Sequence, residues 1–198
     1  MKKNSTTDIL ICGVGGQGIL LASEILSEVF IRAGFDVKKS EVHGMAQRGG
    51  SVESHVRAGE KIYSPFIKKG EADFILAFEN MEGLRYLDYL APEGKLIHNI
   101  QKIIPLSVTI GGAQYPKNPD AIAAQYGIKS IPIDAIGIAQ RLGSDKVVNI
   151  ILLGLLAQYL DIKKEIWLNI ISEWMSLKRL SPKMVEINQK AFEAGFTN

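Results

Sequence analysis

The sequence predicts an α/β fold: a Rossmann-like, three-layer arrangement with a mostly parallel sheet and a helical C-terminal third. Three observations predict this class. The apolar run at residues 8–12 ends in a glycine-rich turn at 13–18, a helical pattern and a second candidate strand follow it, and the chain is patterned as helices from residue 135 onward. Strands that alternate with helices are typical of a parallel sheet covered by helices on both faces.

The first half of the chain is expected to begin with a strand–helix–strand unit. Residues 19–33 carry apolar side chains at helical spacing, and Gly34 follows where a C-cap belongs. Residues 35–42 form the second candidate strand, so we expect a right-handed crossover between two parallel strands. The other elements expected in this half are strands at 51–58, 73–78 and 95–99 and a helix at 79–90.

The second half is expected to be mostly helical. Residues 100–119 contain several prolines and glycines and are predicted to form an irregular connection or lid. A short helix at 120–126 and a strand at 130–134 follow, and Pro132 favours a position for that strand at the edge of the sheet. The remaining predicted helices are at 135–142, 145–160, 163–177 and 182–194.

The composition is that of an ordinary globular protein and excludes several classes. The chain has 198 residues, 46% of them hydrophobic and 22% charged, which is sufficient for one substantial core. Its 23 Lys and Arg against 21 Asp and Glu leave a net charge of only +2, which argues against nucleic-acid binding. One cysteine excludes an internal disulfide and, with three scattered histidines, argues against a zinc site or iron–sulfur cluster in this chain.

No segment has the character of a secretion signal or of a membrane span. Polar residues 4–8 stand where the apolar region of a signal peptide would begin. The most apolar stretch, residues 147–160, is shorter than the roughly 18–20 residues that a span requires, and Asn149 and Gln158 interrupt it. We therefore expect a buried core helix here, no contact with a membrane, and a protein of the cytoplasm.

The glycine turn is the first candidate site. Gly13, Gly15 and Gly18 match the pattern G-x-G-x-x-G between a strand and a helix. The first glycine of this pattern permits a tight turn, the second lets the backbone approach a phosphate, and the third allows close helix–strand packing. The free N–H groups at the start of the helix would face an anion. Gly16 and Gln17 complete this candidate site, and the alternative is a turn that binds no ligand or docks against another chain.

A second polar loop, residues 41–51, is expected at the same C-terminal rim of the sheet, because it follows the second strand. Arg48 presents a planar fork of donors that suits phosphate or carboxylate. Gln47 adds amide donors, and Gly49 and Gly50 let the backbone approach a ligand closely. The alternative is a solvated arginine on a flexible loop.

Four further residues are weighed against structural roles. Cys12 ends a buried strand and is expected to be a small apolar core residue. His55 lies in the middle of a strand and is expected to be structural, whereas His43 follows a strand end and a role in the site stays open. Glu79 follows the 73–78 strand, so it either caps the next helix or faces the site. We find no pattern of catalytic residues.

The combined motifs resemble a known family. The turn at 13–18, the segment 47–52 (Gln-Arg-Gly-Gly-Ser-Val) and His55-x-Arg57 are similar to those of gamma-type subunits of ferredoxin-dependent 2-oxoacid oxidoreductases. Within this family, the likeness is to small (beta) subunits of the indolepyruvate ferredoxin oxidoreductase type. The later segments 134–139 and 149–154 fit the same family.

The resemblance implies a single gamma-type domain over residues 1–198, acting as a subunit of a heteromeric enzyme. That enzyme would oxidatively decarboxylate aryl 2-oxoacids such as indolepyruvate to acyl-CoA and pass electrons to ferredoxin. Thiamine diphosphate and iron–sulfur clusters would lie on the large catalytic subunit. The resemblance implies that this chain helps to bind coenzyme A or closes the active site, through residues 13–18 and 47–50.

Two other classes stay open at this point. A stand-alone NAD-binding protein would place an acid at the end of the second strand for the ribose hydroxyls. Glu41 is the nearest candidate, but Lys38 and Lys39 precede it and no second partner is evident. A regulatory or ligand-sensing Rossmann-like module is the third class.

Overall fold

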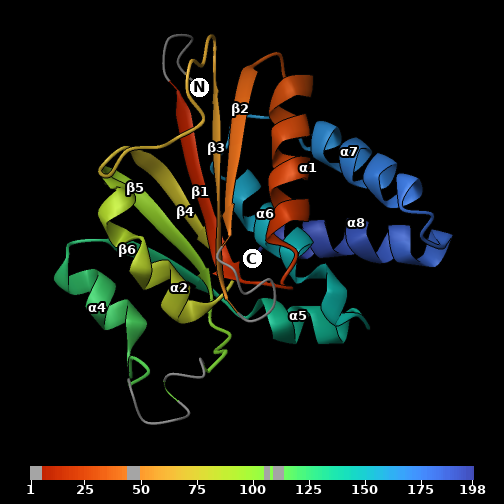
Figure 1. Ribbon diagram of the computed structural model, residues 1–198. Helices are drawn as coiled ribbons and strands as arrows, with labels where there is room; N and C mark the ends of the chain where they lie inside the picture. Colours follow the sequence, from red (N-terminus) through yellow and green to blue (C-terminus); the bar gives the residue numbers. More distant parts are fainter. Residues whose placement is uncertain (1–5, 44–49, 105–107, 109–113) are drawn as a thin grey trace.

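The computed structural model describes residues 6–43, 50–104, 108 and 114–198. In this part of the chain, six strands form one sheet in the order β2-β3-β1-β4-β5-β6 (Figure 1). The strands are β1 (Thr7–Val14), β2 (Asp36–His43), β3 (Ser51–Gly59), β4 (Ala72–Ala77), β5 (Leu90–Asn99) and β6 (Lys129–Ile133). β3 runs against the others, which are parallel to one another. The predicted mostly parallel sheet is confirmed, with β6 at its edge.

Helices cover both faces of the sheet, so the predicted three-layer class is confirmed. Figure 1 shows α2 and α4 on one face and α1, α6, α7 and α8 on the other. The helices are α1 (Ile19–Arg32), α2 (Asn80–Arg85), α4 (Pro119–Gln125), α5 (Ala135–Arg141), α6 (Val148–Ala157), α7 (Lys164–Leu177) and α8 (Pro182–Phe196). The helix expected at 79–90 is shorter than predicted, because the chain turns into a 3₁₀ turn at Leu87–Tyr89 and then into β5.

The core follows from the alternation of side chains along β1. Ile9 and Ile11 belong to the large core under α1 and α5 to α8. Leu10 and Cys12 point to the other face and pack with residues of α2 and α4. All four side chains are fully buried, as expected for a central strand covered on both faces.

The apolar stretch near residue 150 is a core helix, as predicted. Every residue of α6 is buried, and the helix packs against α8 and α5. Across residues 6–43, 50–104, 108 and 114–198, no helix has both the length and the apolar character that crossing a bilayer would require.

The strand–helix–strand unit differs from the expectation in one respect. β1 and β2 are parallel, but β3 lies between them and pairs antiparallel with both. Val14 at the end of β1 is therefore opposite Ser51 at the start of β3, and Val52 is opposite His43 at the end of β2. This register brings both ends of the connection from β2 to β3 to the C-terminal rim, beside the glycine turn.

Candidate functional site

The glycine turn at the C-terminal rim has the conformation that its sequence predicts. Gly16 and Gly18 have φ values of +102° and +84°, which favour glycine. A methyl group on Gly13 would lie 2.8 Å from Cβ of Phe78, so the turn packs tightly on the end of β4. Gly18 is the N-cap of α1, and no side chain caps this helix. The first N–H groups of α1 are therefore left for another acceptor.

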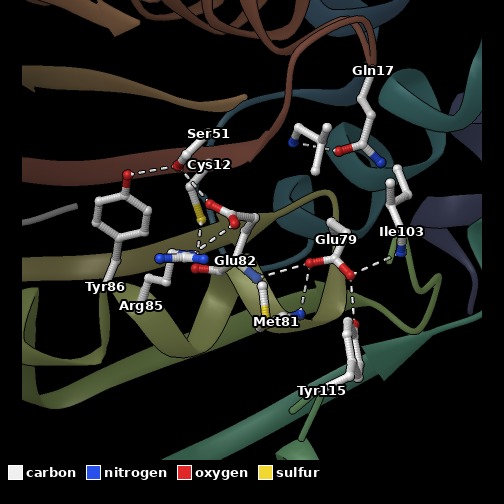
Figure 2. A network of polar contacts seen from close by, with 11 residues as sticks. Cys12, Gln17, Ser51, Glu79, Met81, Glu82, Arg85, Tyr86, Ile103 and Tyr115 are labelled. Atoms are coloured by element: carbon white, nitrogen blue, oxygen red, sulfur yellow. Dashed lines mark hydrogen bonds and ion pairs between the residues drawn. The ribbon is translucent and has the colours of Figure 1, made fainter. Parts of the chain in front are cut away.

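Gln17 holds this turn from within. Its Oε1 accepts a hydrogen bond from the backbone N–H of Val14 at 2.7 Å, and its Nε2 donates to the carbonyl of Phe78 at 3.0 Å and to Oε1 of Gln101 at 3.3 Å (Figure 2). The sequence selects Gln17 as a ligand contact, but in this structure its amide groups bond to the protein itself. Gln17 thus fixes the shape of the turn.

The structure brings one residue of the second predicted loop to the glycine turn. The N–H of Gly15 donates to the carbonyl of Gly50 at 2.8 Å. The turn and the residue before β3 are therefore in direct contact at the same rim. Gln47, Arg48 and Gly49 lie outside the described residues.

Two hollows flank the turn. One, of about 640 Å³, is mainly apolar and has Leu20 and Val52 in its wall with Lys178 at its side. The other, of about 440 Å³, is more polar and includes residues from the segment before α6 and from α6 itself. Gly16 and Gly18 border both hollows, so a ligand at the turn has room on either side.

Glu79 caps α2, as one of the two predicted alternatives states. Its side chain is fully buried and accepts from the N–H groups of Met81 and Glu82 at 2.8 and 2.9 Å (Figure 2). Its other oxygen accepts from the N–H of Ile103 at 3.0 Å and from the hydroxyl of Tyr115. Burial and this bond to Glu79 raise the pKa of Tyr115. One carboxylate therefore ties the irregular segment after β5 to the C-terminal rim.

A second buried carboxylate, Glu82, was not selected from the sequence. Its oxygens accept from the hydroxyl of Ser51 at 2.5 Å and from Nε of Arg85 at 2.8 Å (Figure 2). The hydroxyl of Tyr86 lies 3.1 Å from that of Ser51, and burial raises the pKa of Tyr86. Together these groups hold the start of β3. The spacing of Glu79 and Glu82 by three residues, on one face of a helix, is the only signal that could have indicated this cluster.

The remaining candidates have structural roles. Cys12 is fully buried, and burial raises the pKa of its thiol, with the nearby carboxylates of Glu82 and Glu53 adding to the effect. His55 is buried and its Nδ1 accepts from the N–H of Ile67 at 3.2 Å, which confirms the structural prediction. Lys39 lies 2.7 Å from Glu41, so an ion pair engages the carboxylate that an NAD site would need. His43 ends β2.

No group of three potential metal-ligating side chains is found among the residues that the structure describes. The site consists of backbone donors, an uncapped helix and buried polar side chains that shape the loops. Such an arrangement is suited to binding and positioning an anionic ligand.

The fold and this rim define a Rossmann-like domain of the binding type. The sequence matches the family described as pyruvate ferredoxin/flavodoxin oxidoreductase over residues 8–198, and the chain belongs to this family. It is 38% identical to the indolepyruvate oxidoreductase subunit IorB of Thermococcus kodakarensis, over 95% of this chain and 93% of the relative. The identity to IorB of Archaeoglobus fulgidus is 39%, over 96% and 93% of the two chains.

Solved structures share the fold. The gamma subunit of a keto/oxoacid ferredoxin oxidoreductase from Geobacter sulfurreducens has a TM-score of 0.67 at 26% identity and covers 96% of both chains. A 2-oxoglutarate:ferredoxin oxidoreductase from Magnetococcus marinus, solved with 2-oxoglutarate, coenzyme A and succinyl-CoA, has a TM-score of 0.76 at 20% identity. The match covers 98% of this chain but 31% of that one, so this chain spans about a third of its length.

Proposed function

We propose that this chain is the small, gamma-type subunit of a heteromeric indolepyruvate ferredoxin oxidoreductase. The complex would oxidatively decarboxylate aryl 2-oxoacids to acyl-CoA and reduce ferredoxin. The observation that carries this proposal is the similarity to proteins named IorB, at 34–39% identity over nearly the whole length of both chains. We propose that residues 1–198 form a single domain of this type, located in the cytoplasm.

We propose that this subunit helps to bind coenzyme A. The uncapped start of α1 and the positive-φ glycines at 16 and 18 suit a phosphate group. The bond between Gly15 and Gly50 supports a cradle made by both loops. Its residues would be Gly13, Gly15, Gly16, Gln17 and Gly18, with Gln47, Arg48, Gly49 and Gly50 on the second loop.

The chemistry would lie on the partner. A large catalytic subunit would carry thiamine diphosphate, which supplies carbanion stabilisation for decarboxylation, and iron–sulfur clusters, which conduct electrons to ferredoxin. This chain would hold coenzyme A through its backbone donors and orient it toward that subunit. No residue of this chain is assigned a catalytic role.

The test is co-expression with the large subunit, followed by assays with indolepyruvate, phenylpyruvate, pyruvate and a branched 2-oxoacid. We expect CoA- and ferredoxin-dependent decarboxylation by the complex, with aryl substrates preferred, and no activity of this chain alone. The stand-alone alternative predicts instead that the isolated chain is stabilised by NAD(H) and needs no partner. Decarboxylation that is independent of coenzyme A would contradict the assigned role.

The Arg48→Ala variant tests the second loop. We expect a higher KM for coenzyme A in the assembled complex and unchanged assembly, because a bidentate phosphate contact is lost. An unchanged CoA dependence in the purified variant complex would remove Arg48 from the cradle.

A further inference from the structure

A second helix begins beside the glycine turn. Neither α1 (14 residues) nor α6 (10 residues) has a capping side chain or an acid in its first turn. Asn149 lies in the first turn of α6, and a methyl group on Gly18 would stand 3.1 Å from Asn149 Nδ2. Two helix N-termini, each with unpaired N–H groups and a positive dipole end, therefore meet at one point.

Asn149 points a donor at this meeting point. The residue is only 4% exposed. Its Oδ1 accepts from the N–H of Ile150 at 3.0 Å, and this orientation turns Nδ2 toward Gly18. Within the described part of the chain, Nδ2 donates to no acceptor. A buried amide N–H without an acceptor is unfavourable, so a ligand oxygen at this position would satisfy it.

The polar hollow beside Asn149 has the chemistry of a nucleotide site. Its volume of about 440 Å³ lies in the range of ligand pockets. Lys146 lines it and is exposed, and no ion pair engages this lysine among the described residues. The neighbouring Asp145 could accept from a hydroxyl or amino group. Leu21 and Val148 add apolar wall on which a base could pack.

We infer that this hollow binds the phosphate-bearing adenosine end of coenzyme A, with Asn149 and Lys146 as binding residues from α6 and the turn before it. This inference rests on the proposed function and assigns a direction to the ligand. The phosphates lie between the two helix N-termini. The uncharged pantetheine arm leaves through the apolar hollow on the other side of Gly16, beside Leu20 and Val52.

Two variants of the assembled complex test the assignment. Asn149→Asp keeps the acceptor for the N–H of Ile150 but places a negative charge against the phosphates, and Lys146→Glu reverses a surface charge. We expect the KM for coenzyme A to rise about tenfold or more in the first and several-fold in the second, because charge-assisted bonds to phosphate are replaced by repulsion. The kcat at saturating coenzyme A and the KM for the 2-oxoacid stay unchanged.

Matched controls separate binding from folding. Asn188→Asp changes an equally buried asparagine on α8, where Nδ2 donates to the carbonyl of Met184. Lys183→Glu changes an exposed lysine at the start of the same helix. Neither control should alter the KM for coenzyme A. If Asn149→Asp fails to assemble, Asn149→Ser and Lys146→Glu still decide the question.

The outcomes distinguish the inference from the proposed function. An unchanged KM for coenzyme A in both test variants overturns the inference and leaves the proposed function intact. If the complex has no CoA dependence, the proposed function fails, and the inference is decided by calorimetry of the full chain with adenosine 3′,5′-bisphosphate. Binding that is lost in both test variants keeps a nucleotide site in this hollow, and no binding by the wild-type chain overturns it.

Discussion

The two rims of the sheet use polar groups in opposite ways. At the N-terminal rim, Nε and Nη2 of Arg57 each donate to the carboxylate of Asp8 at 2.9 Å, and Nη1 donates to the carbonyls of Ser64 and Phe66. At the C-terminal rim, α1 starts without a cap and Asn149 presents an unused donor. The N-terminal rim is thus closed by its own charges, whereas the C-terminal rim presents donors to a ligand.

The Arg57→Ala variant should give the largest effect, and this effect should be on stability. It leaves the buried carboxylate of Asp8 unpaired, and breaking such a pair costs about 3–5 kcal/mol. Urea denaturation of the isolated chain measures this loss. If the comparison of the rims is correct, complexes that still assemble keep the wild-type KM for coenzyme A; a raised KM would show that the two rims are coupled.

A pair of glycine variants sharpens the comparison. Gly18→Ala and Gly34→Ala both force a non-glycine residue to positive φ, +84° and +92°, and each should destabilise the chain by about 1–2 kcal/mol. Open space surrounds Gly34, whereas Gly18 faces Asn149. We therefore expect only Gly18→Ala to raise the KM for coenzyme A. Equal KM values in the two variant complexes would show that the turn is a structural feature without a ligand.

Tyr115→Phe tests the smaller structural bonds of the C-terminal rim. The variant removes one of the donors to the buried carboxylate of Glu79, and the expected cost is about 1 kcal/mol because the other donors remain. Thermal unfolding of the isolated chain measures it. A cost near zero would mean that this bond does not hold the segment after β5 in place.

The sequence predicts elements well where one local signal determines them. The apolar run of β1 and the glycines of the turn identify the rim, and the wholly apolar α6 identifies the core. The insertion of β3 between β1 and β2 was not predicted, because an alternating pattern defines a strand but not its direction or neighbours. The inward use of the Gln17 amide and the burial of Glu82 depend on residues distant in sequence, such as Phe78 and Ser51, and no local pattern reveals them.

The smallest expected effect concerns acid pH at the C-terminal rim, where Glu53 is opposite Cys12 in the sheet. A hydrogen bond from His55 and another from Tyr86 lower the pKa of Glu53, although burial opposes the shift. Because the pKa is lower in the folded state, the ionised carboxylate stabilises the fold above its unfolded pKa. That contribution is lost as pH falls through the folded value.

Glu53→Gln should therefore reduce the loss of stability between about pH 5 and pH 3, as measured by urea midpoints at each pH. Glu60→Gln, at an exposed position just after β3, serves as the control and should leave the pH profile unchanged. Parallel profiles for wild type and Glu53→Gln would show that this carboxylate contributes nothing to the rim. A flatter profile would show that the C-terminal rim, although open to a ligand through its backbone donors, is held by charge beneath its surface.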